Sequence, residues 1–128
     1  MIKKLQVLVG ILLLLSLGSS CALFTLTRGL EEALAVEVND VDLSVVEDNV
    51  YKGSYDFERW ANTLSVTVAD HRITTIAIIK DVKYAKQEVS DAIFSKVIEA
   101  QSLQVDAISG STVTSKAYLK SIENALSD

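Results

Sequence analysis

An uncharged, strongly apolar run near the N-terminus constrains this chain more than any other feature. The 22 residues from Leu5 to Leu26 contain no Asp, Glu, Lys or Arg and consist mainly of Leu, Val and Ile. As a helix, the run would span about 30 Å, the thickness of the hydrocarbon core of a bilayer. Lys3 and Lys4 precede the run and acidic residues follow it, so the positive-inside rule places the N-terminus in the cytoplasm. We therefore expect residues 1–27 to form one N-terminal transmembrane anchor.

Two alternatives for the same run stay open. It could be a cleaved secretory signal whose apolar part ends near Leu17, or a lipoprotein signal that uses Cys21 after three small residues. Gly18 stands three positions before that cysteine, where lipoprotein signals usually have a large aliphatic residue. All three interpretations place the rest of the chain outside the cytoplasm. We expect an extracytoplasmic domain at the cell membrane, held there by a single pass.

The rest of the chain is acidic and poor in cysteine and histidine. Without Lys3 and Lys4, residues 28–128 hold 10 basic and 17 acidic side chains, a formal net charge of −7. Such a surface repels nucleic-acid phosphates, so we expect no nucleic-acid partner. A single Cys excludes an intrachain disulfide, a CxxC redox pair and an all-cysteine zinc site, and a single His argues against any zinc site or Ser/His/Asp triad. We predict no catalytic residue and no metal site, so any redox chemistry needs a borrowed cofactor.

The hydrophobic pattern predicts a small α+β domain. We interpret residues 28–47 as a juxtamembrane spacer and residues 48–128 as the domain. Alternating or continuous apolar residues predict strands over 51–57, 64–69 and 73–79, the last of them apolar on both faces and hence central in the sheet. Asp70-His71 would form the hairpin turn between the second and third strands. Helical spacing predicts helices over 84–101 and at the C-terminus, packed on an antiparallel meander.

A hydroxyl-rich segment lies between the two predicted helices. It runs from Asp106 to Ser115 and contains five Ser or Thr residues and one Gly. Unpaired N–H groups and the helix dipole at a helix start favour an anion, and Gly lets the backbone approach a phosphate closely. A simpler role fits the same residues, in which Ser111 or Thr112 caps the last helix and Ser109-Gly110 makes a turn. The residues alone leave both roles open.

The stretch from Glu99 to Ser115 closely resembles the flavinylation region of FMN-binding domain proteins, the family that includes the NqrC and RnfG subunits of membrane electron-transport complexes. The resemblance extends over about residues 41–128. In that family, Asp, two residues, Ser or Thr, Gly, Ala and Thr form a motif whose final Thr is joined through its hydroxyl to the FMN phosphate. Carried over by position, Thr112 is the attachment residue. The other positions that match the motif or its usual continuation are Asp106, Ser109, Gly110, Thr114 and Ser115.

One motif position departs from the family pattern. Ser111 stands where Ala is usual, which leaves a second hydroxyl beside the acceptor. The resemblance implies that a flavin transferase of the ApbE type moves FMN from FAD to Thr112 with Mg²⁺ after export. It also implies an electron carrier that works with membrane or extracytoplasmic redox partners, rather than a stand-alone enzyme. The alternatives are reversible FMN binding, a structural subunit of a membrane redox complex, and an anchored binding module without a cofactor.

Three further residues invite a functional interpretation, but each has a simpler one. Trp60 could stack on a flavin, although a single Trp at the start of a strand usually packs in the core or at its rim. His71 belongs to the predicted turn, where a solvated residue is expected rather than a ligand or base. Tyr118 lies on the apolar stripe of the last helix, so we expect it in the core.

Overall fold

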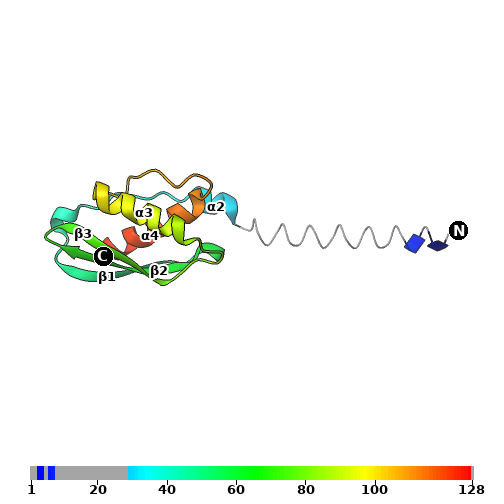
Figure 1. The fold of residues 1–128 in the computed structure, drawn as a ribbon, viewed down its shortest axis with the longest axis horizontal. Coiled ribbons are helices and arrows are strands. Elements are labelled where there is room, and N and C mark those ends of the chain that lie inside the picture. Colours follow the sequence, from blue (N-terminus) through cyan, green and yellow to red (C-terminus); the bar gives the residue numbers. More distant parts are fainter. Residues whose placement is uncertain (1–2, 5, 8–28, 128) are drawn as a thin grey trace. The chain divides into compact units, whose positions relative to one another are not determined.

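The computed structural model describes residues 3–4, 6–7 and 29–127 (Figure 1). The chain divides into two compact units, Met1–Leu30 and Glu31–Asp128. In the first unit, residues 3–4 and 6–7 are helical. The expected membrane segment, Leu5 to Leu26, lies outside the described residues except for positions 6 and 7. Of the helices within the described ranges, none has the length and apolar character needed to span a membrane.

From residue 30 onward the chain forms an α+β fold. Its elements in chain order are α2 (Leu30–Leu34), the 3₁₀ turn η1 (Leu43–Val45), β1 (Asn49–Tyr55), the 3₁₀ turn η2 (Glu58–Trp60), β2 (Asn62–Ala69), β3 (Arg72–Lys80), α3 (Gln87–Ala100) and α4 (Thr112–Leu126). The strands make one antiparallel sheet in the order β1-β2-β3. Helix α4 packs against β1 and β2, and α3 packs against β3 and α4 (Figure 1). The predicted antiparallel meander with two covering helices is confirmed.

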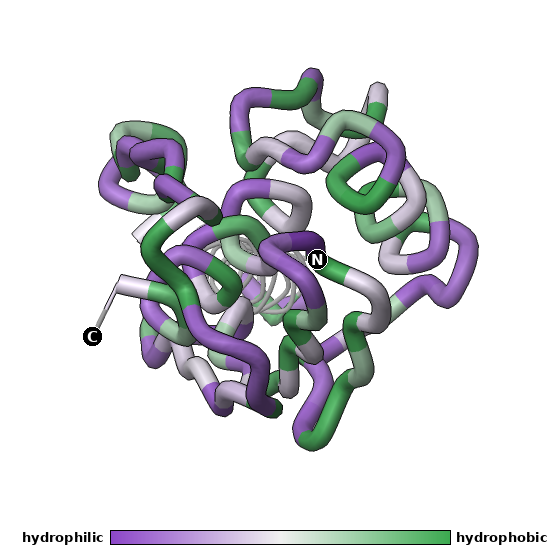
Figure 2. The backbone as a smooth tube through the Cα atoms, turned by 90° about the vertical axis from the view of Figure 1, so that its left-hand side faces the viewer, coloured by the Kyte–Doolittle hydropathy of each residue, from purple (hydrophilic) through white to green (hydrophobic). Residues whose placement is uncertain are grey.

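The core lies on one face of the sheet. Along β2, every second side chain is buried, and the positions between them are only half-buried until the strand ends. The buried residues of β2 are Asn62, Leu64, Val66 and Val68. Figure 2 shows hydrophobic and hydrophilic positions changing at short intervals along the described tube, as amphipathic helices and one-sided strands require. The one-sided pattern predicted for this strand is therefore confirmed.

The prediction for the third strand is wrong in its position within the sheet. Strand β3 pairs only with β2 and forms an edge, while β2 is central. In β3, Ile73 is buried beneath the helices, but Ala77 and Ile79 point to the opposite face and are exposed, Ile79 by 54%. Apolar residues on both faces suggested burial on both faces, but three strands with helices on one side leave the other face uncovered.

Local backbone geometry explains the observed element boundaries. Asp70 and His71 both have positive φ, 53° and 60°, so the predicted two-residue turn is confirmed. Helix α3 begins at Gln87 instead of residue 84, because Tyr84 is left-handed with φ 57° and Lys86 is extended. The first strand is shifted by two residues, from the predicted 51–57 to Asn49–Tyr55.

The segment before β1 belongs to the folded unit, although the sequence suggested a spacer over residues 28–47. The compact unit begins at Glu31. We call residues 34–40 the strap, because polar contacts hold them against α4 and the loop that follows α3. Among these contacts, the carboxylate of Asp40 accepts hydrogen bonds from Leu103 N–H at 3.0 Å and from the Ser102 hydroxyl at 2.8 Å. The compact unit therefore contains the strap as well as the residues expected to form the domain.

Candidate functional site

The proposed attachment residue lies at the start of the last helix. Thr112 is the first residue of α4, and its side chain is exposed. Its hydroxyl makes no hydrogen bond to any residue that the structure describes, whereas the neighbouring Val113 is buried. Position 112 therefore presents an accessible hydroxyl that no internal contact uses.

The first turn of α4 leaves backbone donors free. Its first backbone hydrogen bond runs from Ser115 N–H to the Ser111 carbonyl oxygen at 2.9 Å. The N–H groups of Thr112, Val113 and Thr114 have no acceptor within residues 29–127. Ser111 occupies the N-cap position, but its side chain makes no capping hydrogen bond. Helix capping by the Ser111 side chain, the simpler role, is therefore not observed. The free N–H groups of the first turn are the kind of donors that bind an anion.

Ser115 holds the loop before α4 in shape through two hydrogen bonds. Its hydroxyl accepts a hydrogen bond from Ile108 N–H at 3.0 Å and donates one to the Ser111 carbonyl at 2.7 Å. The N–H of Ser111 closes the same turn by donating to the Ile108 carbonyl at 2.9 Å. Ser115 is fully buried. Of the hydroxyls predicted to bind a cofactor, this one is already used inside the protein, where it shapes the loop that leads to Thr112.

The rest of the motif faces solvent. Asp106, Ser109 and Gly110 are exposed, and Thr114 is half-buried. Gly110 has φ 78°, and nothing lies within 4 Å of the place where a Cβ would be, so the space beside it is open. The Nζ of Lys96 on α3 donates to the Asp106 carbonyl at 3.3 Å, which places a positive charge beside the loop. An open, glycine-containing loop with a cation nearby can receive a phosphate.

Lys116 lies on α4 near Thr112, and the sequence pattern did not single it out as a site residue. It follows Thr112 by four residues, so the two side chains lie on the same face of α4. Its Nζ donates to the Leu34 carbonyl at 2.6 Å. The spacing of four residues from Thr112 is the signal that could have indicated Lys116. A lysine at that spacing is equally expected on the solvent-exposed face of an amphipathic helix.

The three residues with a simpler interpretation are all occupied by structural contacts. Trp60 is buried, its ring stacked near Phe57 and lying 4.4 Å from the Arg59 guanidinium carbon. His71 lies in the turn, where its Nδ1 is 3.1 Å from the Leu43 carbonyl oxygen. These positions agree with core packing for the tryptophan and a turn position for the histidine.

Tyr118 is in the core, as expected. It is fully buried, and its hydroxyl donates to Asp81 Oδ1 at 2.6 Å. Burial, this hydrogen bond and the charge of Asp81 together raise the pKa of the Tyr118 phenol far above its ordinary value. The phenol therefore stays protonated at physiological pH and serves as a fixed donor.

Fold and site together define a small α+β domain with an anion-ready loop at the start of its last helix. Residues 61–127 match the family model described as the FMN-binding domain, and the chain belongs to that family. No curated protein matches the chain. The matched region begins just before β2 and includes the motif loop and α4, whereas the strap and β1 precede it. Membership supports an FMN-binding flavoprotein.

The residues at the loop fit the phosphate end of FMN. The fit rests on the unpartnered hydroxyl of Thr112, the three free N–H groups of the first turn, and the open space beside Gly110. Together these groups offer hydrogen-bond donors and an oxygen nucleophile at one place, without any charge that would repel a phosphate from the first turn itself.

Proposed function

We propose that this protein carries FMN through a phosphoester on Thr112 and acts as a membrane-anchored, extracytoplasmic electron carrier. The observation that supports the attachment most directly is the exposed, unpartnered Thr112 hydroxyl at a helix start with free N–H donors. The motif places the same residue at the attachment position. Family membership supplies the cofactor.

The attachment is a group transfer that a separate enzyme would catalyse. A flavin transferase of the ApbE type, with Mg²⁺, would use FAD as the donor of the FMN group. The Thr112 oxygen would form a bond to the phosphorus of the FMN half, the diphosphate P–O bond would break, AMP would leave, and the hydroxyl proton would pass to a base of the transferase or to water. The protein gains FMN less one water. No electrons are exchanged in this step.

Each residue of the loop has a distinct part in this proposal. Thr112 provides the link, and the N–H groups of the first turn provide hydrogen bonds to the remaining phosphate oxygens. Ser115 keeps the loop in shape through its two hydrogen bonds. Ser111 lies beside the acceptor and is half-buried, so Thr112 presents the more accessible of the two hydroxyls. The flavin, once bound, accepts and donates one or two electrons.

The localisation completes the proposal. The uncharged run from Leu5 to Leu26 would anchor the chain, with the N-terminus in the cytoplasm and the domain outside. A covalent link is useful there, because a dissociated cofactor would be lost to the bulk. The electron donor and acceptor would be membrane or extracytoplasmic redox proteins.

The test is the intact mass of the denatured protein after export in cells that also produce a flavin transferase. Wild type should gain the mass of one FMN less one water. Thr112→Ala should gain nothing, whereas Ser111→Ala and Thr114→Ala, which each remove a neighbouring hydroxyl, should be modified like wild type.

Each other outcome points to a different function. If the wild type has an unmodified mass but a flavin absorbance when native, the binding is reversible. If the native wild type is colourless, the domain is a cofactor-free module. If the modification is lost in Ser111→Ala but kept in Thr112→Ala, the acceptor is Ser111.

A further inference from the structure

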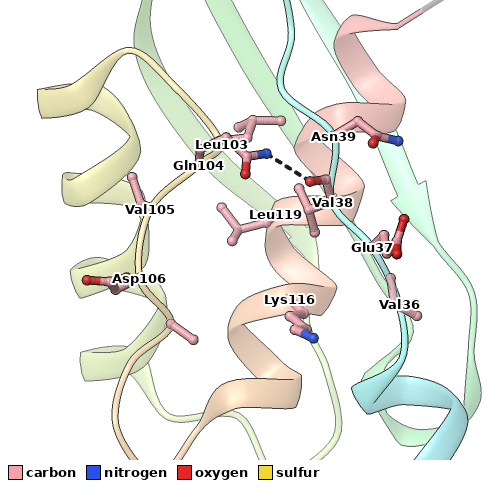
Figure 3. A pocket seen from close by; sticks show the side chains of 11 residues that line it. Val36, Glu37, Val38, Asn39, Leu103, Gln104, Val105, Asp106, Lys116 and Leu119 are labelled. Atoms are coloured by element: carbon pink, nitrogen blue, oxygen red, sulfur yellow. Dashed lines mark hydrogen bonds between the residues drawn. The ribbon is translucent and has the colours of Figure 1, made fainter.

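A groove of about 520 Å³ lies along α4, between the strap and the loop that follows α3. Figure 3 shows the two segments on either side of the helix, with Lys116 and Leu119 between them. The apolar side chains that line the groove include Val36 and Val38 from the strap and Val105 from the loop. A volume of this size is in the range of small-molecule sites.

The groove lies along the face of α4 that also carries Thr112. Thr112, Lys116 and Leu119 follow one another at spacings of four and three residues, so they form one stripe along the helix. The last two line the groove. From Thr112 to Leu119 the helix rises about 10 Å. FMN is longer than this from its phosphate to the far end of its ring, so a flavin tethered at Thr112 would be long enough to reach the groove.

The strap wall is held in place by side chains from the other two walls. Lys116 Nζ donates to the Leu34 carbonyl at 2.6 Å, and Gln104 Nε2 donates to the Val38 carbonyl at 2.8 Å, the bond drawn in Figure 3. The Asp40 carboxylate is bonded to the loop at Leu103 and Ser102. These bonds join the strap to both α4 and the loop, so the groove has a defined shape before any ligand enters it.

We propose that this groove receives the isoalloxazine ring of FMN attached at Thr112, and that the strap shields the ring from solvent. The proposal rests on the proposed attachment at Thr112. The valines of both walls and Leu119 offer apolar contact to the ring, while Lys116, one turn from Thr112, lies between the phosphate end and the ring end. The strap precedes the region matched by the family model, so the shielding is a property of this chain's own N-terminal segment.

The test fills the groove without touching the attachment residue. Val105→Phe adds a ring to the groove wall, and phenylalanine does not itself quench flavin fluorescence as tryptophan or tyrosine does. The matched control is Val50→Phe, because Val50 on β1 is 60% exposed and does not line the groove. Each protein is produced with a flavin transferase, its covalent FMN is confirmed by intact mass, and quenching of flavin fluorescence by iodide is measured at constant ionic strength.

We expect the flavin of wild type and of Val50→Phe to be quenched several-fold less than free FMN. In Val105→Phe the covalent mass should remain, but quenching should rise several-fold towards the value for free FMN. Gln104→Ala, which removes one strap bond and adds no bulk, should raise quenching in the same direction and guards against misfolding of the phenylalanine variant.

The two proposals fail in different ways. If denatured wild type carries no FMN mass, the attachment is wrong and the ring site falls with it. If the mass is present but wild type is quenched as strongly as free FMN, or neither groove variant changes the quenching, the attachment stands and the ring lies elsewhere.

Discussion

The side-chain amide of Gln101 pairs with both backbone groups of Ile73, as a neighbouring strand would. Its Nε2 donates to the Ile73 carbonyl at 2.9 Å, and its Oε1 accepts from Ile73 N–H at 2.7 Å. Gln101 stands at the end of α3 in a left-handed conformation, φ 51°, which aims the side chain at the edge strand β3. One residue thus ends a helix, satisfies part of an open sheet edge and ties the two elements together.

Replacing Gln101 by Ala should lower the free energy of unfolding by about 1–3 kcal/mol, because both backbone groups of the half-buried pair lose their partner. Glu99→Ala, at an exposed position of the same helix, is the control and should change stability little. Urea unfolding gives the free energy, and hydrogen exchange at the Ile73 amide gives the local effect. Unchanged exchange in Gln101→Ala would show that the pairing does not protect this edge.

Gly53 should not tolerate a side chain. A Cβ at this position of β1 would collide with the Ser121 carbonyl oxygen and lie within 2.6 Å of the Ala125 Cβ on α4. We expect Gly53→Ala to destabilise the domain by about 3 kcal/mol, the upper end of the usual cost of overpacking, because the closest atom belongs to the backbone. Gly110→Ala is the comparison that introduces backbone strain without steric overlap, because Gly110 has φ 78° but nothing lies within 4 Å of the added Cβ. It should cost about 1 kcal/mol, so equal losses in the two variants by thermal unfolding would contradict the packing argument.

Ser115→Ala should loosen the motif loop. The substitution leaves the Ile108 N–H without its partner and removes the bond to the Ser111 carbonyl, at an expected cost of about 1–3 kcal/mol. Modification of Thr112 should also become slower, because the loop no longer presents the hydroxyl in one arrangement. Ser109→Ala, at an exposed position, is the control for both effects. The readouts are urea unfolding and the time course of intact mass; a wild-type time course in Ser115→Ala would rule out the presentation role.

Acid should weaken the attachment of the strap through Asp40. Partial burial raises the pKa of Asp40, but the hydrogen bonds from Leu103 N–H, the Ser102 hydroxyl and Val41 N–H outweigh this effect and hold the pKa below its ordinary value of 3.8. A carboxyl with a lowered pKa in the folded state stabilises fully above its unfolded pKa, and this contribution is lost as pH falls through the folded pKa.

Asp40→Asn tests that argument. At neutral pH, we expect it to lose about 1 kcal/mol of stability relative to wild type. The difference should shrink as the pH is lowered from about 5 to below the folded pKa, because wild type loses the same charge-assisted bonds by protonation. Urea midpoints of both proteins over this range provide the measurement, and a difference that stays constant with pH would exclude Asp40 as the titrating group.

Local sequence patterns were sufficient to predict the main strands and helices and to find the motif. Alternation along β2, the helical spacing in α3 and α4, and the left-handed turn at Asp70-His71 depend on neighbours in the chain, so they can be predicted from it. The motif from Asp106 to Thr112 likewise pointed to Thr112 as the attachment residue, which stays a prediction, whereas membership of the FMN-binding domain family confirms the resemblance. The membrane anchor stays a prediction from the uncharged run.

Only the tertiary structure decided which elements meet. The pattern of Ile73–Ile79 shows that both faces are apolar, but not that the strand has a neighbour on one side only. The strap has no sequence signal because Lys116 and Gln104 bind backbone carbonyls at Leu34 and Val38, and every residue has such a carbonyl. Ser115 could be predicted as one hydroxyl among five, but its role as a brace depends on the path of the loop around it. The sequence therefore determined the family and the hydroxyl that we propose for attachment, and the fold determined the walls of the groove beside it.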